Sequence, residues 1–89
     1  MQLGKIIGTV TATRKDENLV SSKLMIVQPV NEKQENISTA IVAVDTVGAG
    51  IGELIFFVTG SVAYHAFNEK ACDAAILGIV DNISLMEVL

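Results

Sequence analysis

The chain has little of what most ligand chemistries require. Its 89 residues include one cysteine, one histidine, one proline and no tryptophan. A single cysteine cannot build a disulfide framework, and one cysteine with one histidine cannot supply the usual four-ligand zinc module. Aromatic residues make up only 4% of the chain. This argues against a stacking platform for single-stranded nucleic acid.

Basic charge and long apolar runs are also scarce. Six Lys and Arg residues stand against ten Asp and Glu residues, which gives a formal net charge of -4. This balance is a poor match for a phosphate-binding surface. No segment approaches the ~18 consecutive apolar residues that a membrane span requires. The first five residues, MQLGK, lack the basic flank and cleavage site of a signal peptide, so we expect a cytosolic protein.

What the chain has in excess is apolar content. Hydrophobic residues make up 51% of it, and adding the seven glycines raises the apolar share to roughly 58–59%, against about 45–50% in typical domains. This length allows one domain, and a small domain should need less apolar content rather than more. The excess excludes a disordered chain and predicts that other subunits bury part of the surface.

The residue pattern predicts an all-β fold, a small five-stranded antiparallel barrel with one short helix. We also expect a short helix over residues 62–67, capped by Ser61. Residues 81–89 are expected to continue the last strand or to pair beside it. Because no long crossover helix occurs, the strands should pair mainly antiparallel and close into a small barrel. The expected strands are residues 3–13, 23–28, 39–44, 54–59 and 74–80.

The segments between the strands carry turn signals. Residues 14–18 (RKDEN) indicate a turn, and residues 31–38 (NEKQENIS) indicate an exposed polar loop. Pro29 is expected to end the second strand, because proline cannot donate to a ladder. The apolar run at 39–44 (TAIVAV) predicts a strand buried on both faces.

Residues 45–53 (DTVGAGIGE) have glycine at every second position from Gly48 to Gly52. The spacing differs from a nucleotide-binding GxGxxG turn, because Glu53 stands where the last glycine belongs, and no long helix follows. The segment therefore predicts a shaped loop. Asp45 and Glu53 flank it as a potential acid–base pair, but a barrel filled by its own side chains leaves little pocket. We expect Asp45 to cap the loop and Glu53 to bind backbone amides or a neighbouring subunit.

Two further groups of residues are candidates for a metal site and for a catalytic nucleophile. His65, Glu69, Cys72 and Asp73 have ligand-type side chains, but at least one must come from an irregular segment, which makes a closed metal site improbable. Cys72 or Ser61 as a nucleophile would need a base, and His65 is the only histidine. Neither sequence context is typical of catalysis, so no catalytic residue, metal or cofactor is predicted.

Four stretches together make the chain recognisable. Residues 3–15 (LGKIIGTVTATRK), 23–29 (KLMIVQP), 44–53 (VDTVGAGIGE, followed by Gly60-Ser61) and 74–81 (AAILGIVD) run in order through nearly the whole chain. They resemble the bacterial microcompartment vertex proteins of the EutN/CcmL family.

That resemblance implies an OB-like barrel (the oligonucleotide/oligosaccharide-binding fold) assembled as a cyclic homopentamer. Such pentamers cap the five-fold vertices of a microcompartment shell in the bacterial cytoplasm and supply the curvature that closes it. Hexameric shell proteins would then be partners, with no role for nucleic acid or membrane.

Two sets of site residues follow from the same resemblance. Val47, Gly48, Ala49 and Gly50 are expected near the ring axis, where they line a narrow pore. Lys15, Lys23 and the loop at residues 31–38 are expected on the rim that faces the hexamers. A nucleic-acid-binding or small-ligand-binding barrel of the same shape remains the alternative. Against it, the adjacent Phe56 and Phe57 should point to opposite faces of a strand, so they cannot form one stacking surface.

Overall fold

The structure, a computed structural model, describes residues 1–11, 23–66 and 72–86. The turn predicted at residues 14–18 lies outside the described residues. The elements are β1 (Gln2–Val10), β2 (Lys23–Val30), β3 (Ile41–Asp45), β4 (Leu54–Thr59), α1 (Gly60–Ala66) and β5 (Ala74–Ile79).

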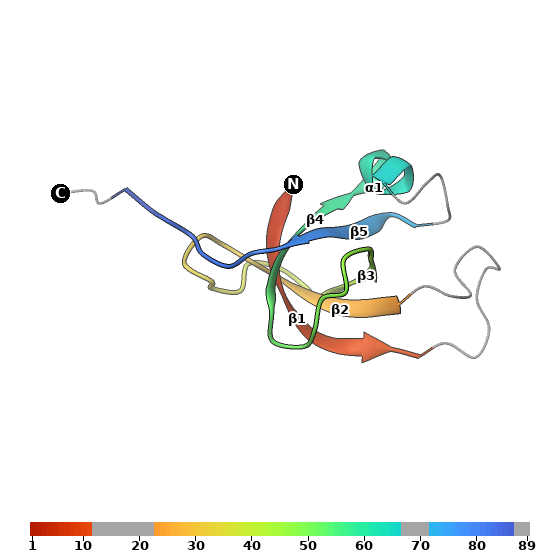
Figure 1. Cartoon of the computed structure of the whole chain (residues 1–89), viewed down its shortest axis with the longest axis horizontal. Coiled ribbons are helices and arrows are strands. Elements are labelled where there is room, and N and C mark those ends of the chain that lie inside the picture. The colour runs from red at the N-terminus through yellow and green to blue at the C-terminus, as the bar shows by residue number, and fades with distance from the viewer. Residues whose placement is uncertain (12–22, 67–71, 87–89) are drawn as a thin grey trace.

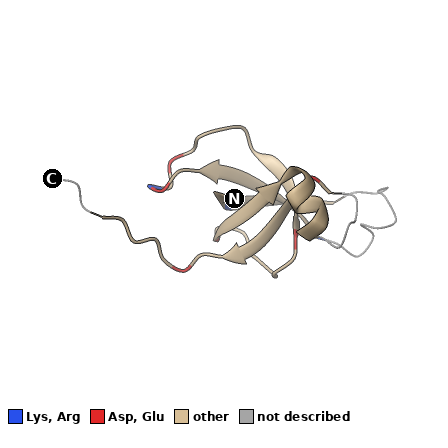
Figure 2. Cartoon of the chain, turned by 90° about the horizontal axis from the view of Figure 1, so that it is seen from above, with Lys and Arg blue, Asp and Glu red and all other residues tan. Residues whose placement is uncertain are grey.

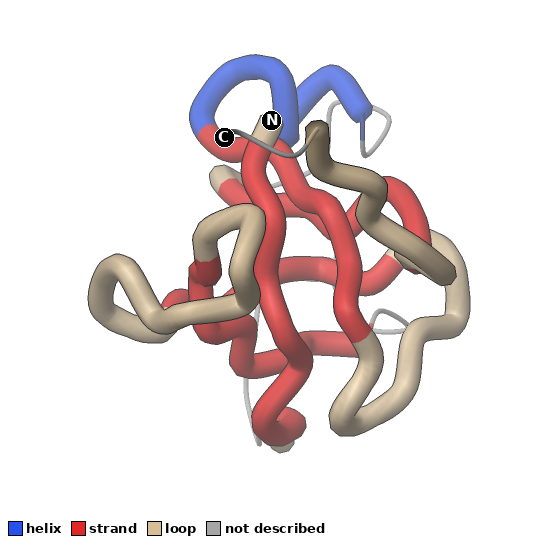
Figure 3. The backbone as a smooth tube through the Cα atoms, turned by 90° about the vertical axis from the view of Figure 1, so that its left-hand side faces the viewer, coloured by secondary structure: helices blue, strands red, loops and turns tan. Residues whose placement is uncertain are grey.

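These strands close into one barrel in the order β1-β2-β3-β5-β4 (Figure 1). Four of the five pairings are antiparallel, as the lack of a long crossover helix predicts. The fifth differs, because β3 and β5 are parallel, with Val44 opposite Ala75 and Asp45 opposite Ile76. Since β4 and α1 intervene between them, β5 returns in the direction of β3 and closes the barrel. Figure 3 shows the strands wrapped around one core, with α1 outside them.

The core follows from alternation along each strand, which sends every second side chain inward. Phe57, Ile6, Ile55, Ile76 and Val27 are the largest side chains with under 2% exposure. β1 approaches its neighbours closely at Gly4, where a Cβ would lie 2.5 Å from Val27 Cγ1 and 3.1 Å from Phe57 Cε1. A side chain at this position would therefore push the strands apart.

The helix α1 covers a second apolar cluster on the outside of the barrel. Ala63 is fully buried against Val58 and Ala75, with Cys72 and Leu77 beside them. The helix begins at Gly60, whose φ is 68° and whose N–H donates to the Asp73 carbonyl at 2.7 Å. The predicted cap at Ser61 is therefore wrong, because Ser61 lies inside the helix. No helix in the described part of the chain is long and apolar enough to cross a membrane.

Two predicted boundaries are wrong for identifiable reasons. β2 continues through Pro29, which pairs with Gly4. β3 pairs with β2 only as far as Val27. Beyond it the following loop lies beside β2, and Pro29 accepts a hydrogen bond there from the Ile37 N–H at 3.2 Å, so the missing N–H of the proline breaks no pairing with β3. At the other end of the chain, residues 81–86 form no strand and run away from the barrel (Figure 1).

The polar loop predicted at residues 31–38 is confirmed, and residues 32–38 are all exposed. Asn31 orders it, because its Oδ1 accepts hydrogen bonds from the N–H groups of Lys33 (2.9 Å) and Glu35 (3.0 Å). The strands, in contrast, carry few charges among the described residues (Figure 2), namely Lys5, Lys23 and Asp45.

Candidate functional site

The glycine loop after β3 is held by the carboxylate of Asp45. Its Oδ1 accepts hydrogen bonds from the N–H groups of Val47 (3.0 Å) and Gly48 (3.1 Å). Its Oδ2 accepts one from Ala49 N–H at 3.0 Å. One side chain thus satisfies three successive backbone donors, which fixes the turn. The prediction that Asp45 caps the loop is confirmed.

Glu53 closes the other end of the loop. Its Oε1 accepts the N–H of Gly50 at 2.6 Å, while its own N–H donates to the Gly50 carbonyl at 3.2 Å. Backbone bonds then join the loop to β1, from Gly52 N–H to Ile6 O (2.8 Å) and from Ile6 N–H to Glu53 O (3.1 Å). Because the hydrogen bonds of both carboxylates are to loop amides, their role is structural, and the geometry gives no support to an acid–base pair.

The four predicted pore residues of the loop differ in their exposure to solvent. Val47 and Gly48 are exposed, and Gly48 has a φ of 77°, which favours glycine. Ala49 is only 4% exposed and packs into the barrel core, and Gly50 is half-buried. Thr46 Oγ1 donates to the Ile76 carbonyl at 2.6 Å and ties the loop to β5. The tip of the loop is therefore Val47 and Gly48, with Ala49 as its anchor.

The structure describes only one of the two lysines predicted on the rim. Lys23 is exposed at the first residue of β2, where the strand register sets it opposite Asp45. Lys15 lies outside the described residues.

The structure does not assemble the ligand-type residues into a metal site. His65 is exposed on α1, with its ring 5.4 Å from that of Tyr64, whereas Cys72 packs under the helix. Glu69 lies outside the described residues. Across the ranges that the structure covers, no group of three or more His, Cys, Asp and Glu side chains could hold a metal ion.

Cys72 is placed as a packing residue. Its Sγ lies 3.4 Å from the Ala63 carbonyl and can donate to it. Burial raises the pKa of the thiol, and the nearby negative charge of Asp73 raises it further. A raised pKa lowers the thiolate fraction at neutral pH, so the environment is the reverse of the one that activates a nucleophilic cysteine.

Sequence reasoning missed one surface, the outer face of β2 and β3. Inward-facing Met25, Val27 and Ala43 belong to the core. Alternation therefore turns the intervening apolar side chains outward. We define the β2–β3 outer face by these four residues: Leu24, Ile26, Val42 and Val44. Of these, Val42 is exposed, Leu24 and Ile26 are partly exposed, and Val44 is covered in the single chain.

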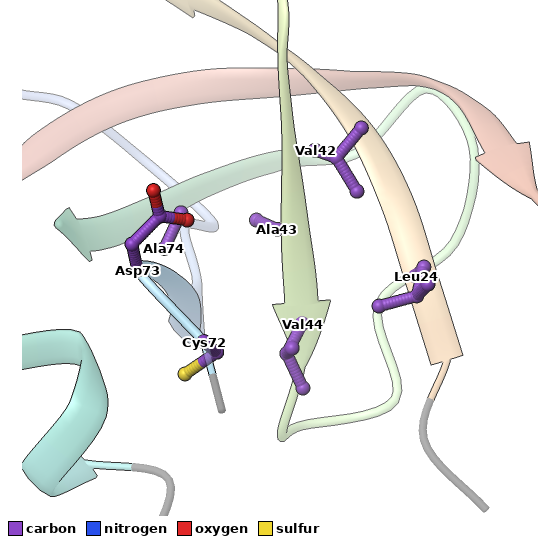
Figure 4. A pocket seen from close by; sticks show the side chains of 7 residues that line it. All are labelled: Leu24, Val42, Ala43, Val44, Cys72, Asp73 and Ala74. Atoms are coloured by element: carbon purple, nitrogen blue, oxygen red, sulfur yellow. The ribbon is translucent and has the colours of Figure 1, made fainter. Parts of the chain in front are cut away.

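An open hollow of about 190 Å³ lies on this face (Figure 4). Its lining is apolar apart from Asp73, with Leu24, Val42 and Val44 contributed by the face itself. Val42 is 49% exposed, so the prediction that this strand is buried on both faces is wrong for the single chain. The apolar run of β3 is the signal that could have located the surface.

Comparison with known proteins decides the family. Residues 1–81 match the family described as "Ethanolamine utilisation protein EutN/carboxysome". The chain belongs to the EutN/CcmL family. The resemblance inferred from the four stretches is thus confirmed.

The relatives of this EutN/CcmL chain align along almost its whole length. The shell vertex protein GrpN of Rhodospirillum rubrum is 44% identical, over 93% of this chain and 96% of GrpN. The carboxysome shell vertex protein CcmL of Thermosynechococcus vestitus is 38% identical, over 94% and 87%. The shell vertex protein PduN of Salmonella typhimurium is 40% identical, over 94% and 99%.

A solved structure of a relative also matches. The structure described as the GrpN pentameric microcompartment shell protein from Rhodospirillum rubrum has a TM-score of 0.88 to this chain. The match covers 98% of this chain and 100% of that one. The barrel is therefore the fold of a known pentameric subunit.

Proposed function

We propose that five copies of this chain close into a ring that occupies the five-fold vertices of a bacterial microcompartment shell. The likeness to the pentameric GrpN, at 44% identity over nearly the whole chain, carries the proposal. The mechanism is geometric, because a flat layer of hexagonal tiles cannot close, and a pentamer at each vertex supplies the curvature.

The surface chemistry of the single chain supports assembly into a ring. Large hydrophobic side chains stay exposed at Ile7 (51%), Val42 (49%) and Ile51 (66%). They account for the apolar excess seen in the composition. A ring of identical subunits joined head to tail would cover such surfaces, because each interface joins two different patches.

The glycine loop suits a position near the ring axis. Asp45 and Glu53 hold it rigidly, and its tip carries only Val47 and the side-chain-free Gly48. Small residues allow five loops to converge with a narrow opening between them. Ala49 and Gly50 would support this lining from behind.

The proposal includes a purely structural role with no catalysis. The carboxylates of Asp45 and Glu53 are engaged by loop amides, and Cys72 has a raised pKa, so the strongest candidate groups serve to hold the fold. The remaining contacts, with hexameric shell proteins, would be made by the rim, including Lys23 and Lys15.

Co-expression with hexameric shell proteins of a microcompartment tests this role. Electron microscopy of the purified particles should show closed polyhedral shells only when this chain is present, and open sheets or tubes when it is omitted. Lys23→Glu should reduce incorporation into shells while leaving the ring itself intact, whereas Lys23→Arg, the matched control, keeps the positive charge and should leave incorporation unchanged. Closed shells in equal number without the chain would contradict the proposal.

The alternative, an OB-like barrel that binds nucleic acid or a small ligand, is not favoured. Phe57 is 1% exposed in the core, and Phe56 faces outward over Gly78, so the two rings do not share a surface. The net charge of -4 also opposes binding to phosphates.

A further inference from the structure

The segment that follows β5 leaves its own barrel with apolar side chains uncovered. Val80 N–H donates to the Leu54 carbonyl at 2.8 Å, and residues 81–86 then continue without strand pairing. Leu85 is 55% exposed and Met86 is 87% exposed. In Figure 1 this segment projects well beyond the strands. We call residues 81–86 the tail segment.

The β2–β3 outer face is the complementary feature. It is apolar, it carries the hollow lined by Leu24, Val42 and Val44, and β3 has a free backbone edge beside it. β5 pairs with β3 only at Val44 and Asp45, so the edge of β3 from Ile41 to Ala43 has no strand partner in the described part of the chain. A second hollow of about 470 Å³ continues along this edge past Ile41 and Val42.

We propose that the tail segment of each copy docks on the β2–β3 outer face of the next copy in the ring. This inference rests on the proposed pentamer and names the surfaces that join its subunits. In an extended tail, Ile83 and Leu85 point to the same side, so both can enter the apolar hollow. The tail backbone can then pair with the free edge of β3, as in strand addition.

The described tail segment does not line the hollow of its own barrel. The tail leaves from the end of β5, whereas the hollow is lined by residues just before and at its start, Asp73 and Ala74. Figure 1 shows these two regions at opposite ends of the strand. Because the tail and the face are different patches, their contact is head-to-tail, and such contacts close into a ring when the rotation allows.

Disulfide trapping tests the contact directly. The chain has one cysteine, so the background variant is Cys72→Ala, to which Val42→Cys and Leu85→Cys are added. Mild oxidation should give a ladder of covalent oligomers on a denaturing gel, ending at the pentamer. The matched control carries Tyr64→Cys with Leu85→Cys, which places an exposed thiol on α1 instead, and it should stay monomeric on the same gel.

The native mass of each variant separates the possible failures. A pentamer by native mass that gives no ladder, or the same ladder in the Tyr64→Cys control, would overturn the docking proposal and leave the proposed function intact. A wild-type chain that stays monomeric would overturn the proposed function, and with it this contact.

A second set of variants tests the contact without engineered cysteines, in case the trapping variants assemble poorly. Ile83→Ser with Leu85→Ser should lower the fraction of pentamer at least tenfold at equal concentration, whereas Ser84→Ala, on the opposite side of the tail, should not. Unchanged pentamer in the double serine variant would also overturn the proposal. Thermal melting by circular dichroism should show a folded barrel in both variants.

Discussion

At the scale of single residues, the loop after β3 depends on one carboxylate. Asp45→Ala removes three hydrogen bonds to the amides of Val47, Gly48 and Ala49. We expect the free energy of unfolding to fall by about 1–3 kcal/mol, because bonds to charged groups are the stronger ones and this carboxylate is partly exposed. Urea denaturation measures the change.

A conservative variant at the same position and a control variant elsewhere test this prediction. Asp45→Asn keeps an oxygen acceptor and should cost less than Asp45→Ala. Asp81→Ala removes an exposed carboxylate from the tail segment and should change stability by no more than about 0.5 kcal/mol. Equal stability of Asp45→Ala and the wild type would contradict the structural role of this side chain.

Cys72 gives a prediction about alkaline pH. Burial and Asp73 raise the pKa of its thiol in the folded chain. Between the unfolded value, about 8.5, and the folded one, the unfolded chain releases the proton first, so stability falls as the pH rises. The free energy of unfolding should therefore decline more steeply above about pH 8.5 in the wild type than in Cys72→Ala.

Alkylation checks the same environment independently. Since Cys72 is the only cysteine, iodoacetamide uptake followed by mass spectrometry reports this thiol alone. Its alkylation at pH 8 should be several-fold slower in the folded chain than in denaturant, because less thiolate is present and the thiol is partly covered. Faster alkylation of the folded chain would show an activated cysteine and contradict the assignment.

At the scale of elements, the glycine loop links stability to assembly. A Cβ at Gly50 would lie 3.3 Å from Glu53 Oε1, the oxygen that accepts the Gly50 N–H. Gly50→Val should therefore distort the loop and lower the fraction of pentamer, as measured by native mass spectrometry. Ile37→Val, a small change at an exposed residue of the 31–38 loop, should leave assembly unchanged. Normal pentamers from Gly50→Val would contradict a role of this loop in ring closure.

The elements also show how far the sequence was informative. β4 matches its predicted range of 54–59, because a continuous apolar run bounded by Glu53 and Gly60 has well-marked ends. The continuation of β2 through Pro29 was not predictable, since it depends on where β3 stops pairing. Nor was the parallel pairing of β5 with β3, which is a property of barrel closure rather than of either strand.

The local contacts of the candidate site were predicted from the sequence, but the facing of its residues in the barrel was not. The hydrogen bonds of Asp45 and Glu53 are local, within four residues of each side chain, so the sequence pattern suggested them correctly. The inward position of Ala49 and the exposure of Val42 depend on which face of the barrel each residue occupies. Such facts require the three-dimensional arrangement.

At the scale of the whole molecule, a single chain leaves apolar side chains exposed to solvent. The barrel fills its own core, yet Val42, Ile51 and Leu85 stay between 49% and 66% exposed. A folded monomer would leave these side chains in water, whereas a ring can cover them. The proposed ring would therefore cover apolar surface that the single chain leaves exposed.

The native mass of the purified chain tests the central claim most directly. Native mass spectrometry, with light scattering after size exclusion as a check, should give the mass of five chains of 9.4 kDa each. A stable monomer at micromolar concentration would contradict the vertex assignment and leave the exposed apolar face of β2 and β3 unexplained.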